Sequence, residues 1–321
     1  MLFILTNSQD ATVNFLVSVL EKSGIPSVRL DTDQLLPRVA LSYRLGAPAI
    51  RVDSKWYCSD DIQSIWYRRP EQLTDTRFDN SPETNYTRSE WTEFIECFFA
   101  HVEVERWVNH PARNARASRK LEQLTTAVRL GLKVPDTLVT QDPEELRSFY
   151  RKHKGQLVVK PVSSGYVDRP NEERDTLIYT NQVFEKHLEE LEDLAVCPTL
   201  FQQRICKRND VRITIVGSDI HAVELLAEDK LGEQRCDIRR NNMSDVIYQS
   251  ISLPDSVEAG LRKLMTHYEL RFGAIDMAIA NTGEWYFFEI NPNGQWAWLD
   301  MIGGTNIAAS FIKLFSKEIN S

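Results

Sequence analysis

The sequence predicts a mixed α/β (α+β) protein that begins with a small α/β domain and ends with a largely antiparallel sheet. The apolar run "LFILT" (2–6) precedes apolar residues at helical spacing between positions 13 and 20, and "SVRLD" (27–31) resumes as a strand, which is a βαβ opening. From residue 198 onward, β-rich segments follow one another with a single helix at about 255–268. The 321 residues suffice for about two to three domains.

Composition and charge exclude several classes of protein. The net charge of −8 argues against nucleic acid as a bulk partner, because phosphate binding needs a basic face. No apolar run approaches the ~20 residues that span a bilayer, and the first strand lacks the basic region of a signal peptide, so we expect a cytoplasmic protein. The five cysteines form no CxxC pair and no metal-site spacing, so we interpret them as reduced thiols.

The first hundred residues continue the α/β pattern. The segments "ALSYRL" (40–45) and "SIWYRR" (64–69) are typical of further strands. Residues 74–88 are polar, contain a proline and show no period, which predicts a loop. Apolar residues at i, i+3, i+4, i+7, i+8 and i+11 then predict an amphipathic helix over 91–102. We assign residues 1–105 to this domain.

The middle of the chain predicts a second α/β unit, over residues 106–195. Its expected elements are a helix at 117–130, a strand at 156–161, a polar loop at 163–175, a strand at 176–180 and a helix at 182–193. The loop contains glycine and proline and follows directly on the strand that ends in Lys160.

The C-terminal part, 196–321, contains the most informative pattern. The β-rich runs "FGAIDMAIA" and "EWYFFEIN" flank "NTG", which predicts a hairpin. A two-residue loop at 282–283 places Asp276 opposite Glu289, and a four-residue loop at 281–284 gives the same pair. Strand alternation puts Asn291 on the face of Glu289. Directly opposite Cβ atoms lie about 4.5–5.5 Å apart, so three oxygen-bearing side chains converge.

This convergence predicts a metal–nucleotide site. Two carboxylates at such a distance repel each other and cost free energy when desolvated without a partner. A Mg²⁺ ion removes both costs, since it takes oxygen ligands and usually keeps phosphate oxygens in its shell. The alternative is a solvated strand face on which the two acids meet by chance.

Candidate cations for the phosphates lie elsewhere in the chain. Lys160 ends an apolar strand, Lys120 begins a helix, and Arg212 alternates with apolar residues on the polar face of its strand. Taken alone, either lysine is more typical of a solvated surface than of a phosphate site. The segment "QQRI" could offer backbone groups to adenine; it consists of Gln202, Gln203, Arg204 and Ile205. The sequence has no Walker A motif, no GxGxxG and no kinase HRD motif.

The order of these parts resembles the ATP-grasp superfamily and, within it, the microviridin-type peptide macrocyclases, or graspetide ligases. The resemblance covers nearly the whole chain. It rests on "WYRRP" (66–70), "ASRKLEQL" (117–124), "GLKVPDTLVT" (131–140), "VVKPVSSG" (158–165), "LIYTNQV" (177–183) and "FEINPNGQWAWLD" (288–300). One departure is the single Gly165 after Lys160, where many ATP-grasp enzymes have a loop richer in glycine.

The resemblance implies an ATP-grasp fold with an N-terminal α/β domain, a central lid domain and a C-terminal antiparallel-sheet domain that binds ATP and Mg²⁺. It implies metal ligands at Asp276, Glu289 and Asn291. It implies nucleotide contacts at Lys120, Lys160, Gln202, Gln203, Arg204, Ile205 and Arg212. The loop 163–175 becomes a candidate lid over the phosphates.

The implied reaction activates a side-chain carboxylate of a ribosomally made precursor peptide as an acyl phosphate, which a hydroxyl or amine then attacks to close an ω-ester or ω-amide ring. A cation must hold the carboxylate, and arginine pairs with carboxylates in a bidentate fork. The candidates are Arg68, Arg69, Arg239 and Arg240, with Arg69, Arg240 and Arg212 assigned catalytic roles. Adjacent strand residues face opposite ways, so only one of Arg68 and Arg69 should point into the site.

Two other functions stay open. One is an ATP-grasp amino-acid ligase of the ribosomal-protein glutamate-ligase type, and the other is a nucleotide-binding regulator without catalysis. The metal triad and both lysines argue against the regulator, and "NPNGQWAW" favours the macrocyclase. The expected partner is a precursor peptide with leader and core, with neither nucleic acid nor membrane; a homodimer stays open.

Overall fold

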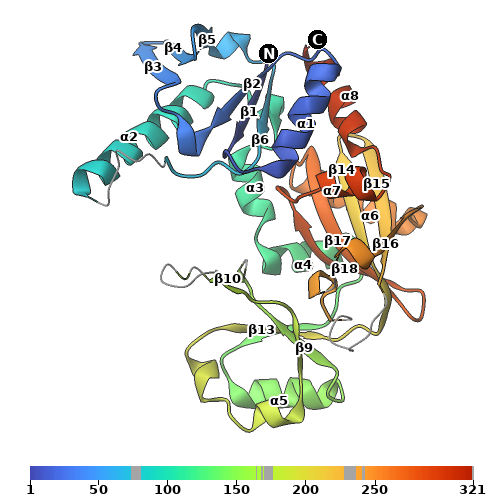
Figure 1. Ribbon diagram of the computed structural model, residues 1–321. Helices are drawn as coiled ribbons and strands as arrows, with labels where there is room; N and C mark the ends of the chain where they lie inside the picture. The colour runs from blue at the N-terminus through green and yellow to red at the C-terminus, as the bar shows by residue number, and fades with distance from the viewer. Residues whose placement is uncertain are drawn as a thin grey trace.

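The computed structural model describes residues 1–73, 81–163, 165–167, 169, 176–227, 236–240 and 243–319. Three groups of strands follow one another along the chain (Figure 1). An N-terminal unit with two small sheets is followed by a central four-stranded sheet and a C-terminal five-stranded sheet. The predicted mixed α/β class is confirmed.

The N-terminal unit is built around a parallel sheet of order β2-β1-β6-β7. Its strands are β1 (Leu2–Thr6), β2 (Ser27–Asp31), β6 (Ser64–Tyr67) and β7 (Trp107–Val108). Every side chain of β1 is buried, because α1 (Ala11–Lys22) covers one face and α2 (Pro82–Phe99) the other. A second, antiparallel sheet is attached to this unit; it consists of β3 (Val39–Arg44), β4 (Ala47–Val52) and β5 (Lys55–Cys58).

The loop predicted for 74–88 is wrong in its second half, while residues 74–80 lie outside the described residues. Helix α2 already begins at Pro82, and Ser81 caps it by accepting a hydrogen bond from the N–H of Thr84. Serine at the cap followed by proline at the first helical position is a strong start signal. The first two turns are mostly solvent-exposed, so they show no apolar period to predict from.

The central sheet has the order β12-β9-β13-β8, and all its neighbours are antiparallel. Its strands are β8 (Thr137–Thr140), β9 (Leu157–Lys160), β12 (Asn181–Val183) and β13 (Thr199–Gln203). Helix α5 (Pro143–Lys152) covers one face through Leu146 and Phe149. A short ladder of β10 (Tyr166–Val167) and β11 (Thr176–Leu177) extends from this unit.

The helix predicted for 182–193 is wrong. The chain forms β12 there and then two 3₁₀ turns, η4 (Glu185–Leu188) and η5 (Glu192–Ala195). The apolar residues Leu188, Leu191 and Leu194 pack on the central core. Their spacing of three residues matches the 3₁₀ period as well as it matches one face of an α-helix, so the pattern did not separate the two.

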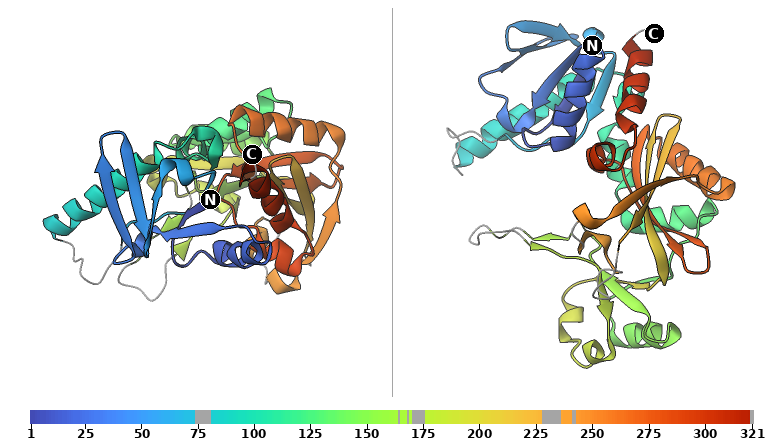
Figure 2. Two further views of the ribbon diagram at one scale, coloured as in Figure 1. Left: turned by 90° about the horizontal axis from the view of Figure 1, so that it is seen from above. Right: turned by 45° about the vertical axis from the view of Figure 1, so that its right-hand side comes forward.

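The C-terminal sheet has the order β16-β15-β14-β17-β18 and is antiparallel throughout. Its strands are β14 (Lys207–Val216), β15 (Asp219–Leu226), β16 (Ile247–Ile251), β17 (Phe272–Ala280) and β18 (Trp285–Asn291). One face packs on α4 (Lys120–Arg129) and α6 (Asp255–His267). The other packs on α8 (Ile307–Ile319), which lies beside α1 and close to the N-terminus, while α7 (Ala297–Ile302) contacts α1 (Figures 1 and 2).

Sheet membership crosses the domain boundaries expected from the sequence. Strand β7 pairs with β6 of the first sheet, although residues after 105 were assigned to the central domain. Strand β13 pairs with β8 and β9 of the central sheet, although residues after 195 were assigned to the C-terminal domain. The boundaries 1–105, 106–195 and 196–321 stay predictions. Helix α3 (Pro111–Ala117) leads from β7 to α4. None of the described helices is long and apolar enough to cross a membrane.

Candidate active site

A cleft of about 710 Å³ lies between the central sheet and the C-terminal sheet. Most of the residues predicted for the site line it, although they come from eight different elements or loops. They are Lys120, Lys160, Gln202, Gln203, Arg204, Ile205, Arg212, Arg239, Asp276, Glu289 and Asn291. Among the residues that the structure describes, the cleft lining does not include Arg68, Arg69 or Arg240.

The hairpin of β17 and β18 brings the predicted oxygen donors together. Asp276 is directly opposite Glu289, as predicted, and Asn291 is opposite Ala274, two residues farther along. All three side chains face the cleft. The pairing arises by a different route from the one predicted, however.

The loop of this hairpin has three residues, a length between the two that were predicted. Ala280 donates its N–H to the carbonyl of Glu284, so three residues, 281–283, form the loop. That register alone would place Asp276 opposite Phe288. A bulge between Asp276 and Met277 on the paired strand adds one residue of β18 and restores the predicted pair. The bulge also leaves Phe288 lining the cleft beside Glu289.

The three donors suit a hard cation. The Asp276 and Glu289 side chains are 40% and 35% exposed, which leaves their oxygens accessible from the cleft. The Asn291 amide oxygen accepts a hydrogen bond from the N–H of Asn293 at 2.9 Å, which orients it. Carboxylate and amide oxygens are the ligands that Mg²⁺ prefers. Among the described residues, no three His, Cys, Asp or Glu side chains lie together in a group that could hold a metal ion. The Asn291 amide would therefore be the third ligand beside Asp276 and Glu289.

Two lysines lie on the same side of the cleft. The ammonium of Lys120 is 3.6 Å from a Glu289 oxygen and donates to the Ser163 carbonyl at 2.8 Å. The ammonium of Lys160 lies 5.8 Å from the centre of the Phe288 ring. Burial lowers the pKa of Lys160 to about 8; Glu289 opposes this shift and the charge of Lys120 adds to it. A polyanion in the cleft would therefore relieve the repulsion between two cations.

Arg212 connects the donor face to the loop that follows β18. Its Nη1 pairs with Asp276 Oδ1 at 2.7 Å, and its Nη2 donates to the carbonyl of Gln295 at 2.9 Å. Its Nε is buried and has no hydrogen-bond partner within the described part of the chain. The guanidinium is thus fixed beside the three oxygen donors, with part of its donor capacity unused.

The segment after β13 crosses the opposite end of the cleft. The side chain of Gln202 is turned inward and donates to Thr137 Oγ1 at 2.8 Å. The N–H of Arg204 donates to the carbonyl of Gln156. Among the residues that the structure describes, the Arg204 carbonyl and the Ile205 N–H have no partner. They belong to one trans peptide unit and point in opposite directions, so one of the two can face the edge of an adenine base.

Comparisons with known proteins agree with this arrangement. A family model described as "MvdD pre-ATP grasp domain" matches residues 1–115. The crystal structure of macrocyclase MdnC bound with precursor peptide MdnA, from Microcystis aeruginosa MRC, is 26% identical, with a TM-score of 0.84 and 99% of each chain covered. The chain is an ATP-grasp ligase related to the microviridin macrocyclases.

Two further solved structures support this relationship. A RiPP-associated ATP-grasp ligase of Chryseobacterium gregarium, in complex with ADP and a leader and core peptide, is 27% identical with a TM-score of 0.83 over 99% of this chain and 96% of that one. Macrocyclase MdnB from Microcystis aeruginosa MRC is 28% identical with a TM-score of 0.77 over 98% of both chains. The comparison with curated proteins found no match.

The sequence missed a buried ion pair in the cleft of this ligase. Lys207 and Asp210 follow the 202–205 segment in the sequence and line the cleft. Their side chains are 2.7 Å apart and only 11% and 15% exposed. Burial raises the pKa of Asp210, and Lys207 counters this effect. The available signal was that Asp210 alternates with apolar residues on the strand face that carries Arg212.

The two Arg-Arg pairs have different surroundings. Arg68 is fully buried and pairs with Asp10 at 3.3 Å, whereas Arg69 is exposed and donates to the carbonyl of Asn293. As predicted, the two point in different directions, but the inward one enters the protein interior instead of the cleft. A side chain with no accessible surface cannot contact a substrate, so Arg69 is the remaining candidate of this pair.

The second pair lies on the other side of the cleft. Arg239 lines the cleft and pairs with the carboxylate of Asp237, which also accepts the N–H of Thr180. Arg240 bonds to the side chain of Asn181, and both guanidinium groups lie over the Tyr179 ring. Most of the predicted lid at 163–175 lies outside the described residues.

Proposed function

We propose that this ATP-grasp ligase activates side-chain carboxylates of a ribosomally made precursor peptide and closes them onto hydroxyl or amino groups of the same peptide as ω-ester or ω-amide rings. The observation that carries the proposal is the cleft, which combines three oxygen donors with Lys120, Lys160 and Arg212. The likeness over nearly the full length to MdnC, bound with a precursor peptide, supports this substrate class.

ATP would bind along the cleft, with its adenine at the 202–205 segment and its phosphates at Lys120 and Lys160. Either the carbonyl of Arg204 or the N–H of Ile205 would pair with the base edge, because a trans peptide unit points these two groups in opposite directions. Lys120 and Lys160 would contact phosphate oxygens, and ammonium groups suit this role as mobile point charges. The ADP in the Chryseobacterium gregarium ligase supports the use of a nucleotide by this kind of enzyme.

Asp276, Glu289 and Asn291 would hold Mg²⁺. The ion would neutralise charge on the phosphates, which is the main requirement of phosphoryl transfer. Because Arg212 already pairs with Asp276, its guanidinium would stand beside the transferred phosphoryl group. These residues would position the phosphates and neutralise their charge, and the peptide would supply both the carboxylate and the attacking hydroxyl or amine.

The proposed reaction has two steps. A carboxylate oxygen of the peptide attacks the γ-phosphorus, the bond from that phosphorus to the bridging oxygen breaks, and ADP leaves. A hydroxyl or amine of the same peptide then attacks the acyl carbon, loses its proton, and phosphate leaves. Each ring therefore removes one water from the peptide. Arg239, at the cleft wall, is placed to pair with the carboxylate, and Arg69 and Arg240 are further candidates from opposite sides.

Mass spectrometry tests the proposal directly. The protein is incubated with ATP, Mg²⁺ and peptides that combine Thr, Ser or Lys with Asp or Glu, and ring formation appears as the loss of one water mass per ring. A mass gain equal to an added amino acid would instead identify an amino-acid ligase, and ATP binding without turnover on any peptide would identify a regulator. A cytoplasmic location and a homodimer stay predictions; the five unpaired cysteines suit a reducing compartment.

A further inference from the structure

The loop at 292–295, which follows the metal-site strand β18, is held by side chains at every backbone carbonyl. The donors to the carbonyls of Pro292, Asn293, Gly294 and Gln295 are, in that order, Asn109, Arg69, Arg68 and Arg212, at 3.2, 3.2, 3.0 and 2.9 Å. These donors belong to three segments that are far apart in the sequence. A loop with all four carbonyls bonded in this way has little freedom to move.

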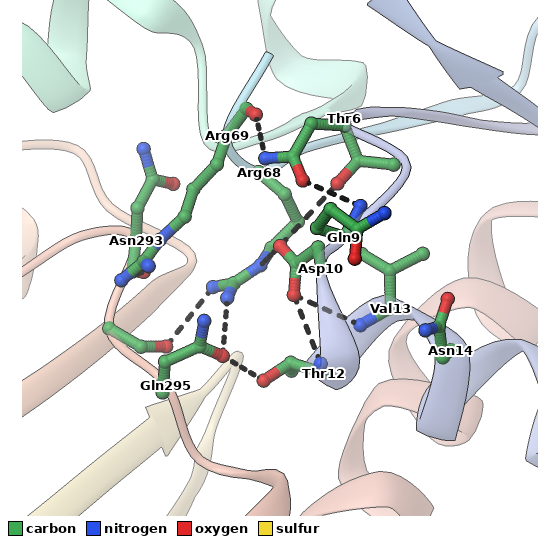
Figure 3. A network of polar contacts seen from close by, with 12 residues as sticks. Thr6, Gln9, Asp10, Thr12, Val13, Asn14, Arg68, Arg69, Asn293 and Gln295 are labelled. Atoms are coloured by element: carbon green, nitrogen blue, oxygen red, sulfur yellow. Dashed lines mark hydrogen bonds and ion pairs between the residues drawn. The ribbon is translucent and has the colours of Figure 1, made fainter. Parts of the chain in front are cut away.

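Arg68 makes the most extensive of these contacts (Figure 3). Its Nη1 donates to the Gly294 carbonyl, its Nη2 donates to Gln295 Oε1 at 3.2 Å, and its Nε pairs with Asp10 Oδ2 at 3.3 Å. The side chains of Arg68 and Asp10 are both 0% exposed. A charge buried this deeply is tolerated only when it is paired and hydrogen-bonded, so these contacts define one position for the guanidinium.

Asp10 connects this pair to the N-terminal unit. Its other carboxylate oxygen caps α1 by accepting the N–H groups of Thr12 and Val13. The hydroxyl of Thr12 also bonds to the Gln295 side chain. The first turn of α1 is therefore joined to the 292–295 loop through both Arg68 and Thr12.

The loop in turn determines the position of site residues. Its Gln295 carbonyl holds Arg212, whose other nitrogen pairs with Asp276. Gly294 packs so tightly that an added Cβ would lie 2.4 Å from the Cβ of Ala274 and 2.8 Å from Arg212 Nη2. The N–H of Asn293 orients the amide of Asn291. A shift of the loop would therefore move Arg212 and the Asn291 oxygen together.

We propose that Arg68 is a positioning residue: paired with Asp10, it fixes the 292–295 loop and thereby holds Arg212 and Asn291 in the arrangement that binds the magnesium–nucleotide complex. The inference rests on the proposed function for the identity of that ligand. It replaces the expectation that Arg68 captures substrate, because Arg68 acts through the loop and has no surface of its own.

The test compares Arg68→Gln with Thr32→Val. Thr32 is also buried in the N-terminal unit and bonds to the carbonyls of Thr6 and Glu71, and none of its hydrogen bonds within the described part of the chain reaches the 292–295 loop. Calorimetry measures the affinity for a non-hydrolysable ATP analogue with Mg²⁺ and with EDTA, below the unfolding temperature of each variant. We expect Arg68→Gln to reduce the gain in affinity that Mg²⁺ provides by at least ten-fold, and Thr32→Val to lower thermal stability while keeping that gain.

Two conservative variants keep the test decisive if Arg68→Gln does not fold. Asp10→Asn keeps the helix cap, since asparagine is an equally good N-cap, but removes the charge opposite Arg68. Arg68→Lys keeps the charge but loses the fork that reaches two loop oxygens. We expect both to reduce the Mg²⁺-dependent gain several-fold.

A parent-like gain in affinity in all variants that fold would overturn the positioning role, as would a loss confined to thermal stability. A different result contradicts the proposed function: the parent protein binds the magnesium–nucleotide complex but closes no ring in any peptide. The affinity comparison remains valid in that case.

Discussion

Lys160 allows the charge state of the nucleotide site to be measured directly. Burial lowers the pKa of its ammonium from the ordinary 10.5 to about 8. About half of the free protein at pH 8 therefore carries a neutral amine at this position. Phosphate oxygens beside the amine favour its charged form, so the bound state should have a higher pKa. Binding of ATP should take up a proton at alkaline pH.

The size of the effect follows from the pKa. With a bound-state pKa near its ordinary value, proton uptake should be ~0.1 at pH 7, ~0.5 at pH 8 and ~0.9 at pH 9. Nucleotide affinity should then fall by nearly ten-fold between pH 9 and pH 10, because the free protein must first be protonated. The unfolded chain binds this proton up to higher pH than the folded chain, so stability without nucleotide should rise between pH 8 and 10.5.

Calorimetry in two buffers of different ionisation enthalpy measures this uptake, with the phosphates of ATP fully ionised above pH 8. Lys160→Arg is the matched control, since it keeps the charge and does not titrate in this range. It should show no uptake, and it should not restore the affinity lost in Lys160→Ala, because a planar fork does not replace a compact ammonium. Equal uptake by the parent and Lys160→Arg at pH 8 would refute the reasoning.

Three further predictions concern the metal, the substrate and the loop. Glu289→Gln or Asn291→Ala should abolish Mg²⁺-dependent ATP turnover without loss of fold by circular dichroism, and normal turnover in both would remove the metal assignment. Arg239→Ala should slow ring formation at least ten-fold, about 1.4 kcal/mol, with ATP affinity unchanged, whereas Arg240→Ala, outside the cleft lining, should cost less; equal rates for both variants and the parent would place carboxylate capture elsewhere. Gly294→Ala should lower the free energy of unfolding by about 1–3 kcal/mol through overpacking, measured by denaturant titration. An unchanged midpoint would show that the loop can shift to accommodate the added methyl group.

Local backbone geometry made the convergence of the three oxygen-bearing side chains predictable. Side chains alternate along any strand, so Glu289 and Asn291 had to share a face whatever the rest of the chain did. The pair of Asp276 with Glu289 was predicted correctly but from the wrong loop length, and the bulge at Phe288 compensated. A bulge depends on the side chains packed around a strand, and no turn motif announces it.

The sequence by itself determined the mixed α/β class, the hairpin and eleven of the residues that line the cleft, because these follow from periodicity and from the order of short motifs. Only the tertiary structure decided what each inward side chain meets. Alternation separated Arg68 from Arg69, but the partners of Arg68 are Asp10 and Gly294, 58 and 226 positions away. Contacts over such separations arise when whole units pack together, and burial then turned an expected substrate ligand into an internal support for the site.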